Sequence, residues 1–375
     1  MEKDSIARWD TCHGFHGSEA KQFWRTHLKG RSRKLLYVLG SGFDPRMCSG
    51  VEKLLGQMEN SDVTWLCIGL KEEYPEPALV QQAKENNQHL LRLLGDNALI
   101  QRVEIDTWHQ TGISRKRATS RNTMKGLRNQ LNIEAYDDIV VDISSMAQAV
   151  YFTLLGFILS KLDRSKAVPT NLHIIALEDP ELDRLVVQTG IDESASYIRG
   201  FAGQMQTAGL ADVPLLWIPV LGEGERVQLE RLYDFVKPVE ICPVLPFPSR
   251  DPRRRDKLIV EYHDLLMDQW QIEPKNFVFA SERNPFDVYI QLRRLVQRYD
   301  DVLRPIEGCK AVISSQSSKV LSIGAFLAAY ELKNDLNFNV GIVHIESQGY
   351  GFDFSQQPNG ELFSIWVAGE CYGNE

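Results

Sequence analysis

Apolar and polar residues alternate with two different periods along most of the chain. Short apolar runs at 35–39, 63–70 and 98–105 have the length of buried strands, and apolar residues recur at helical spacing between them, at 50–58 and 78–94. Strands that alternate with helices form a mostly parallel sheet with right-handed crossovers. The pattern therefore predicts an α/β fold in the first third of the chain.

The same alternation continues through the rest of the sequence. It predicts a doubly wound α/β protein with a mostly parallel sheet, built from two Rossmann-like halves. Further strands are expected at 139–143, 172–177, 215–220, 240–245, 276–280 and 339–345.

The sequence also indicates a division into three segments. Residues 1–30 carry spaced aromatic and histidine side chains and are expected to form a helical cover on the sheet. Residues 31–245 are expected to form one Rossmann-like domain, and residues 246–375 a second α/β half. The boundary is placed at 243–255, because the four prolines of that segment forbid a regular element.

Two strand-turn-helix segments, 138–162 and 310–332, resemble each other. In the first, an apolar strand ends in a turn that contains Ser144 and Ser145. The second turn contains Ser314, Ser315, Ser317, Ser318 and Lys319. Hydroxyls and backbone amides at the start of a helix favour an anion. The pair predicts a phosphate-bearing ligand, such as a nucleotide, at the carboxyl edge of the sheet.

A third turn, Gly40-Ser41-Gly42-Phe43-Asp44-Pro45-Arg46, follows the first predicted strand. Glycines there let the backbone approach a ligand closely, Asp44 suits a ribose hydroxyl, and Arg46 suits a phosphate. The alternative interpretation is a tight turn in which Asp44 caps the next helix. The ligand-binding residues predicted in this turn are Gly40, Ser41, Gly42, Asp44 and Arg46.

This turn resembles the signature loops of two families. It is similar to the Gly-x-Gly-Phe-Asp-x-Arg loop of class I methyltransferases that use S-adenosylmethionine, although the next strand, at 63–70, lacks a clean terminal acid for the ribose. It also resembles the Gly-x-Phe-Asp-Pro opening of nucleotidylyltransferases, but Ser41 stands where that pattern has glycine and no His-x-Gly-His follows. The dinucleotide fingerprint fails because residue 45 is proline.

The serine-rich segment 314–319 lacks the Gly-x4-Gly-Lys-Ser/Thr order of a Walker A loop. Serines also cap helices for purely structural reasons, so this segment has two alternative roles: binding a phosphate or capping the helix. The paired arrangement, most clearly 312–329, resembles the Rossmann-like ligand-sensing domains of the CARF type in bacterial antiviral systems. That resemblance implies binding of a nucleotide second messenger by Ser314, Ser315, Ser318 and Lys319.

Other candidate chemistry is sparse. His344 and Glu346 share one face at the end of a predicted strand, as a base with its partner or as a hydrogen-bonded edge. Arg253 and Arg254 would clamp a phosphate if the proline-rich loop folds toward the sheet edge. These four residues are accessory candidates. Neither a Gly-x-Ser-x-Gly elbow nor a His-Glu-x-x-His helix is present, so no catalytic residue and no metal ligand is assigned.

Charge adds one further candidate surface. The 375 residues carry a net charge of −8, which gives no overall attraction to nucleic acid. Residues 111–128 nevertheless contain six basic residues and no acid. A solvated surface and a basic flap over a polyphosphate or nucleic acid are the alternatives. The cations named for a nucleic-acid partner are Arg115, Lys116, Arg117 and Arg121.

Scattered cysteines without a Cys-x-x-Cys pair, and no signal peptide, are typical of a cytoplasmic protein. The longest apolar run, 149–159, is too short to span a bilayer, so no membrane partner is expected.

Three functions remain: a nucleotide-binding sensor component of a bacterial defence-type system, an S-adenosylmethionine-dependent methyltransferase that uses the Gly40–Arg46 turn, and a non-catalytic interaction subunit of a larger complex. The partners considered are a nucleotide-like small molecule, a protein partner and a homo-oligomer.

Overall fold

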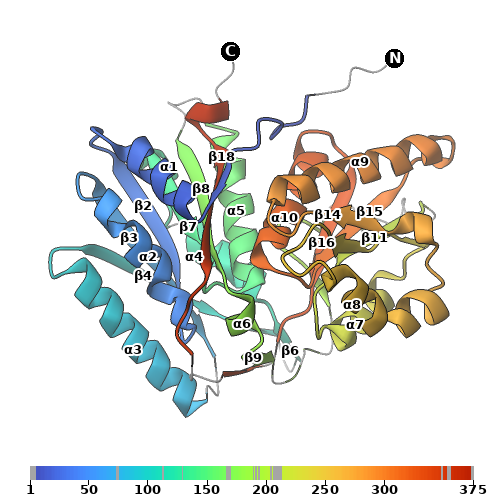
Figure 1. The fold of residues 1–375 in the computed structure, drawn as a ribbon, viewed down its shortest axis with the longest axis horizontal. Coiled ribbons are helices and arrows are strands. Elements are labelled where there is room, and N and C mark those ends of the chain that lie inside the picture. Colours follow the sequence, from blue (N-terminus) through green and yellow to red (C-terminus); the bar gives the residue numbers. More distant parts are fainter. Residues whose placement is uncertain are drawn as a thin grey trace. The chain divides into compact units, whose positions relative to one another are not determined.

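The computed structural model describes residues 6–72, 76–111, 114–128, 130–165, 170–188, 190, 192, 195–202, 205, 213–347, 349–352 and 356–372. The chain forms two compact units. Unit 1 comprises Met1–Gly190 and Ser347–Glu375, and unit 2 comprises Ile191–Glu346. Figure 1 labels the elements of both units.

Unit 1 is built on a mostly parallel sheet. Its strands β2, β3, β4, β7 and β8 run parallel, whereas β18 runs antiparallel to both of its neighbours, β8 and β1. The order of the seven strands in the described ranges is β1 (Gly14–His16), β18 (Glu361–Ala368), β8 (Asn171–Glu178), β7 (Asp138–Asp142), β2 (Lys34–Ser41), β3 (Asp62–Lys71) and β4 (Leu99–Asp106).

Helices cover both faces of this sheet (Figure 1). On one face, α1 (Ser18–Leu28), α2 (Ser49–Leu54) and α3 (Pro77–Leu94) share a core with the strands. On the other, α4 (Thr119–Arg128) packs on α5 (Gln148–Leu162) and on β4. The short elements of unit 1 are α6 (Pro180–Asp183), the β5 (Trp108–Thr111) and β6 (Ser114–Arg117) hairpin, and β9 (Val186–Gln188) paired with β17 (Tyr350–Phe352).

Unit 2 has a second sheet of seven described strands, parallel except for β10. Its order is β10 (Ser196–Tyr197), β16 (Asn339–His344), β15 (Lys310–Ser315), β11 (Leu215–Val220), β13 (Val244–Pro246) and β14 (Val278–Ala280), with β12 (Glu240–Ile241) also paired to β11. One core contains residues of α7 (Arg226–Val236) and α8 (Arg254–Glu261). The helices α9 (Pro285–Leu303) and α10 (Lys319–Asn334) pack on each other and on β14, β15 and β16.

The two sheets share one topology. When the main parallel strands of each unit are numbered in chain order, β4-β3-β2-β7-β8 and β14-β13-β11-β15-β16 both have the order 3-2-1-4-5. An antiparallel strand, β18 or β10, then lies beside the fifth strand. This is the order of the first five strands of a doubly wound Rossmann sheet. The predicted doubly wound α/β class with mostly parallel strands is confirmed.

The division of the chain differs from the one that the sequence suggested. The structure separates the units after Gly190 and returns the chain to unit 1 at Ser347, whereas the predicted boundary lay between 245 and 246. The reason is the long-range pairing of β18 with β8, which places the last strand in the first sheet. The proline-rich loop instead connects β13 to α8 inside unit 2.

The N-terminal cover also contains more than helix. α1 packs on the sheet through Trp24, as predicted for a cover, but β1 extends the sheet itself. Among the described residues, no helix is both long enough and apolar enough to cross a membrane.

Candidate functional site

Each sheet has a topological switch point, at which neighbouring strands send their connections to opposite faces. In unit 1 it lies between β2 and β7, and in unit 2 between β11 and β15. Ligands of open α/β sheets bind outside the carboxyl ends of the strands at such points. The three turns that the sequence singled out end or follow β2, β7 and β15, which are three of these four strands.

The two turns of unit 1 touch each other. The hydroxyl of Ser145 donates a hydrogen bond to the carbonyl oxygen of Gly40 over 3.0 Å. Ser144 is buried; its hydroxyl donates to Asp142 and accepts the backbone N–H of Leu177 at 2.9 Å. Both predicted serines therefore hold the carboxyl edge of the sheet together through their own hydrogen bonds.

Asp44 and Arg46 form an ion pair with each other. Asp44 accepts the backbone N–H of Arg46 at 2.9 Å, so it caps the 3-10 helix Pro45–Cys48, which is the structural alternative for this turn. The buried guanidinium of Arg46 contacts Asp44 at 2.8 Å and Asp183 at 2.6 Å. Burial alone would lower the pKa of Arg46, but the two carboxylates raise it. The cation proposed for a phosphate is thus already neutralised by two acids.

Residues of α3 that the sequence did not single out hold this turn from the side. The Asn86 side chain donates to the carbonyl oxygens of Gly42 and Asp44 at 2.9 and 3.0 Å. The Ser41 hydroxyl donates to Asn87 at 3.2 Å. Asparagines on a predicted helix give no signal of this role, because their partners lie more than 40 positions away.

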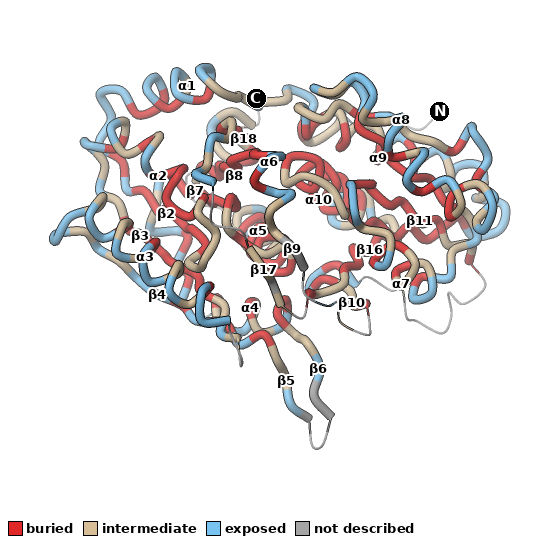
Figure 2. Tube along the Cα trace, turned by 60° about the horizontal axis from the view of Figure 1, so that its bottom comes forward, coloured by how far each residue is buried: buried red, intermediate tan, exposed pale blue. Residues whose placement is uncertain are grey.

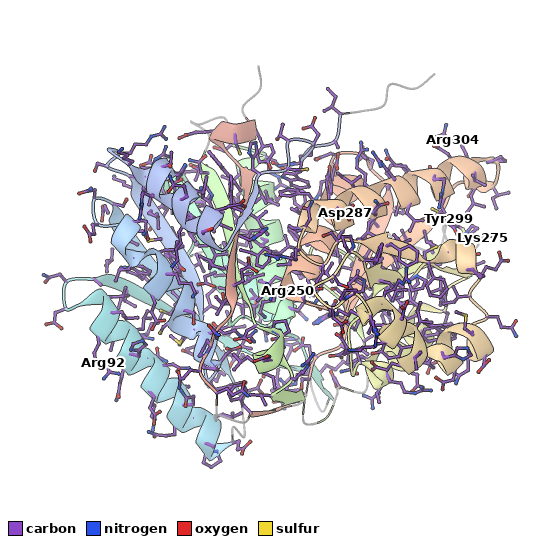
Figure 3. The ribbon with its side chains drawn as sticks, in the orientation of Figure 1. Arg92, Arg250, Lys275, Asp287, Tyr299 and Arg304 are labelled. Atoms are coloured by element: carbon purple, nitrogen blue, oxygen red, sulfur yellow. The ribbon has the colours of Figure 1, made fainter. Side chains whose placement is uncertain are left out.

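An open polar pocket of about 340 Å³ borders the same 3-10 helix. Its lining includes Cys48 and Glu52 on one side and Asn86, His89 and Arg92 of α3 on the other. His89 and Glu52 form an ion pair at 2.6 Å. Figure 3 labels Arg92 on α3. The pocket offers charges of both signs within one unit.

Three serines of the serine-rich turn in unit 2 form hydrogen bonds within the protein. Ser314 is buried, accepts the indole N–H of Trp217 and donates to Gln316, both at 3.1 Å. Ser315 is buried and bonds the Ser322 hydroxyl at 2.8 Å. Ser318 caps α10, accepting the backbone N–H of Leu321.

Ser317 differs from the other serines of this turn. Its hydroxyl oxygen is buried and has no hydrogen-bond partner among the described residues. It directly precedes the Ser318 cap, and Lys319 is the first residue of α10. Across the switch point, a Cβ atom on Gly222 would lie 2.0 Å from the carbonyl oxygen of Gln316, so only glycine allows the loop after β11 to approach this turn.

The arginine-rich loop does lie at the carboxyl edge of unit 2, because it follows the end of β13. Arg254 contacts Glu223 bidentately at 2.7 and 2.8 Å and Glu282 at 3.2 Å, and so bridges the loops that follow β11 and β14. Arg253 is exposed. Of the two arginines predicted as a phosphate clamp, Arg254 already holds two carboxylates.

His344 is the last residue of β16, and Glu346 follows two positions later at the same edge. The ring Nε2 of His344 lies 3.3 Å from the Ser196 hydroxyl and 4.0 Å from Glu346. Burial lowers the pKa of His344 to about 4. The imidazole is therefore neutral near pH 7, and its contact with Ser196 joins the antiparallel strand β10 to the sheet.

One more titratable group at this edge was not anticipated from the sequence. Burial, together with the nearby Glu261, raises the pKa of Glu225 to about 7. Glu225 precedes α7, and its backbone N–H donates to the Tyr262 hydroxyl at 3.0 Å. Carboxyl groups with a pKa near neutrality are frequent at functional sites, so the pKa of Glu225 at the carboxyl edge of this sheet is worth measuring.

The opposite, amino edge of the unit 1 sheet contains a buried polar cluster. His27 and His173 lie 2.8 and 3.3 Å from the same Asp138 oxygen, and their ligand-type atoms all fall within 4.8 Å of one another. Arg33 contacts the second Asp138 oxygen at 3.1 Å, and Asn171 donates to the first at 3.0 Å. Asp138 is surrounded by donors, one of them a guanidinium, which is the environment of a structural carboxylate rather than of a cation ligand.

The predicted site residues thus fall into two groups. Within unit 1, Gly40 and Ser145 are in contact, and the Gly40–Arg46 turn also meets Asp183. The turn 314–319 belongs to unit 2, where it meets Gly222. The expectation that all three turns face one ligand stays a prediction.

Comparison with known proteins places the chain in no family. No family model matches it, and no curated protein matches it. Matching solved structures include a putative universal stress protein from Pseudomonas aeruginosa UCBPP-PA14, at 7% identity over 84% of this chain and 94% of that chain, with a TM-score of 0.22. A functionally unknown protein from Pseudomonas aeruginosa PAO1 matches at 6% identity over 82% and 91%, with a TM-score of 0.22. A universal stress protein from Archaeoglobus fulgidus matches at 9% identity over 84% and 97%, also with a TM-score of 0.22. Likeness at this level carries no argument about function.

Proposed function

We propose that this chain is a nucleotide-binding protein, and that a phosphate group of its ligand binds where α10 begins in unit 2. The observation that carries the proposal is the Ser317 hydroxyl, which is buried and has no partner among the described residues. A buried polar group without a hydrogen bond costs about 1–3 kcal/mol, so proteins rarely retain one without a reason. A bound phosphate oxygen would accept the bond that Ser317 lacks.

The surroundings of Ser317 support an anion at this position. The hydroxyl lies at the positive end of α10, a helix of 16 residues, and next to Lys319. Helix N-termini with basic neighbours bind phosphate groups. The position is also the topological switch point of its sheet, between β11 and β15.

A regulatory role is the finer part of the proposal. The duplicated 3-2-1-4-5 topology supports two ligand-binding halves in one chain, and the resemblance of 312–329 to CARF-type domains suggests a sensor of a nucleotide signal in a defence-type system. In that role the ligand is bound and not consumed. A protein partner or a second copy of the chain would receive the signal.

Calorimetry and thermal-shift measurements on the full chain test this proposal. ATP, ADP, AMP, cyclic dinucleotides and inorganic phosphate serve as probes, and a ligand that binds the folded state raises the melting temperature. The double variant Ser317→Ala/Lys319→Ala is expected to weaken binding at least about tenfold, which corresponds to about 1.4 kcal/mol. Lys275→Ala is the control, because Lys275 lies at the surface of unit 2 away from α10 (Figure 3).

Two outcomes would overturn the proposal. The first is that none of these probes binds or shifts the melting temperature. The second is that a probe binds, but with the same affinity to the double variant as to Lys275→Ala.

A second candidate function, binding of S-adenosylmethionine in unit 1, is favoured by Glu104. The sequence lacked a clean acid at the end of the strand after the Gly40–Arg46 turn, but Glu104 of β4 supplies one from the neighbouring strand. A Cβ atom on Gly69 would lie 2.6 and 2.7 Å from its two carboxylate oxygens, and Gly69 pairs with Ser41 of the turn. An acid beside such a turn suits ribose hydroxyls. Calorimetry with S-adenosylmethionine tests this function, and no binding at millimolar concentration would remove it.

A further inference from the structure

The acid-free basic segment folds as a hairpin followed by a helix. Strands β5 and β6 pair antiparallel, with Trp108 opposite Arg117 and His109 opposite Lys116. Figure 2 shows β5 and β6 extending away from the rest of unit 1. Only Ala118 separates β6 from α4. The sequence suggested a flap or a solvated face here, and the described residues form a two-stranded arm.

The base of this arm is fixed to unit 1. The Arg117 guanidinium lies 4.4 Å from the centre of the Trp108 ring and 3.1 Å from Glu72. The Asn122 side chain donates to the carbonyl oxygens of Asp106 and Trp108 at 2.7 and 3.0 Å. Arg117, one of the cations named for a nucleic-acid partner, is therefore nearly buried and anchors the hairpin instead of presenting its charge.

Four other cations of the segment are exposed: Lys116, Arg121, Lys125 and Arg128. None of them forms a hydrogen bond or an ion pair with a side chain or backbone group in the part of the chain that the structure describes. Unpaired cations such as Lys21 and Lys84 also lie elsewhere on the surface, but residues 107–128 differ in carrying their cations close together with no Asp or Glu among them. A concentration of positive charge in a net negative protein is a surface suited to a polyanion.

The helix arranges three of these cations in one row. Arg121, Lys125 and Arg128 have the spacing i, i+4 and i+7, which places them on one face over about 10 Å of helix. Thr123 and Leu127 are buried on the opposite face. Gly126 lets α4 approach β4, since a Cβ atom there would lie 2.8 Å from Ile105. The row is thereby held on a rigid support.

We infer that the described residues 107–111 and 114–128 form a binding surface for duplex DNA, with β5 and β6 as an arm in a groove and the row on α4 against phosphates. An antiparallel two-stranded ribbon fits the major groove of B-DNA, and basic side chains on a neighbouring helix reach the backbone. Among the described residues of the segment, no large apolar side chain is exposed, which disfavours insertion into a membrane. The inference does not rest on the ligand proposed for unit 2.

Fluorescence anisotropy with the full chain and a labelled 20-base-pair duplex tests this surface. The variant Lys116→Gln/Arg121→Gln/Lys125→Gln/Arg128→Gln is expected to lose at least about tenfold in affinity. Its plot of log K against log salt concentration should be shallower by about 3, because each phosphate contact contributes close to one unit of slope. The matched control removes two lysines and two arginines that are exposed elsewhere: Lys21, Arg25, Lys84 and Arg294.

Each outcome of this experiment decides the inference. A loss confined to the segment variant, with its thermal unfolding unchanged, supports the surface. Equal affinity of both variants for the duplex, or no binding by the native chain at 50 mM salt, overturns it. Binding to vesicles that contain phosphatidylserine, but not to the duplex, overturns it in favour of a membrane surface.

Discussion

Gly40 and Ser145 lie so close together that a Cβ atom on the glycine would fall 2.9 Å from the serine hydroxyl oxygen and 3.0 Å from the serine carbonyl carbon. This contact joins the ends of β2 and β7, the two strands at the switch point of unit 1. Unit 2 repeats the relationship with Gly222 and Gln316. In both units a glycine at the carboxyl end of the first strand or just after it allows close approach to the turn after the fourth.

Gly40→Ala is expected to destabilise unit 1 by about 1–3 kcal/mol, because an added methyl group must displace backbone atoms and not only a flexible side chain. Gly42→Ala is the matched control in the same turn. Its added Cβ would meet nothing within 4 Å, so we expect a change within about 0.5 kcal/mol. Urea denaturation of both variants measures the difference. If Gly40→Ala and Gly42→Ala were equally stable, the backbone near Ser145 would be able to move away from the added methyl group at little cost, and the prediction would be wrong.

Local patterns in the sequence were sufficient to predict most parallel strands of the two main sheets, the turns and the α/β class. The apolar runs at 35–39 and 139–143 became β2 and β7, and the serine-rich turn became the cap of α10. The predicted strand 240–245 is instead two short strands, β12 and β13, because Pro243 lies between them and cannot donate to a ladder.

Long-range relationships could not be predicted in this way. β18 joins the sheet beside β8 although the whole of unit 2 lies between them in sequence, and no local sequence pattern indicates such a pairing. The same holds for Arg46, whose second carboxylate, Asp183, is 137 positions away. The hairpin at 108–117 was missed because its strands are polar and basic and lack an alternating apolar face.

Arg46→Gln separates a structural role of Arg46 from a ligand-binding role. The guanidinium side chain is only 5% exposed and contacts two carboxylates. Its loss leaves Asp44 without its partner in a largely buried place, so we expect a loss of about 3 kcal/mol in the absence of any ligand. Arg31→Gln is the control, because Arg31 is 51% exposed and its ion pair with Glu370 is worth less than about 1 kcal/mol. If Arg46→Gln is as stable as the native chain, the structural role is contradicted and a role of Arg46 in binding a phosphate is favoured.

His173 is expected to make unit 1 less stable in mild acid. Burial lowers its pKa to about 4, against the contribution of Asp138, whereas the unfolded chain binds a proton near pH 6.5. The unfolded state therefore gains protons first, and stability is lost as the pH falls from 6.5 toward 4, by about 2 kcal/mol at pH 5. Asp138 adds nothing in this window: burial alone would raise its pKa, but the hydrogen bonds from His173 and His27 lower it far below the ordinary value.

Hydrogen exchange at pH 7.5 and pH 5, corrected for intrinsic rates, measures this loss in peptides from β7 and β8. His173→Gln should remove the pH dependence there, while peptides from β16 keep theirs because His344 has a similarly lowered pKa. Equal protection of β7 and β8 in the native chain at both pH values would contradict the prediction.

Glu225 should act with the opposite sign in unit 2. Burial and the nearby Glu261 raise its pKa to about 7 from an ordinary value of 4.5, so the folded state holds a proton that the unfolded state releases. The stability that this proton contributes is present below pH 4.5 and is lost as the pH rises through 7. Glu225→Gln mimics the protonated side chain. Its gain in stability over the native chain is therefore expected to grow by about 2–3 kcal/mol from pH 5 to pH 8.

Comparison of variant and native chain at each pH cancels the contribution of His344, which both share. Asp234→Asn on the same helix is the control, because Asp234 is exposed. Hydrogen exchange of α7 peptides, or urea denaturation followed by fluorescence, gives the stabilities. A constant difference between Glu225→Gln and the native chain across this range would mean that Glu225 is ionised throughout.

If a nucleotide binds nearby at the edge of this sheet, its negative charge should raise the pKa of Glu225 further, so the gain from Glu225→Gln at pH 8 should increase with ligand present.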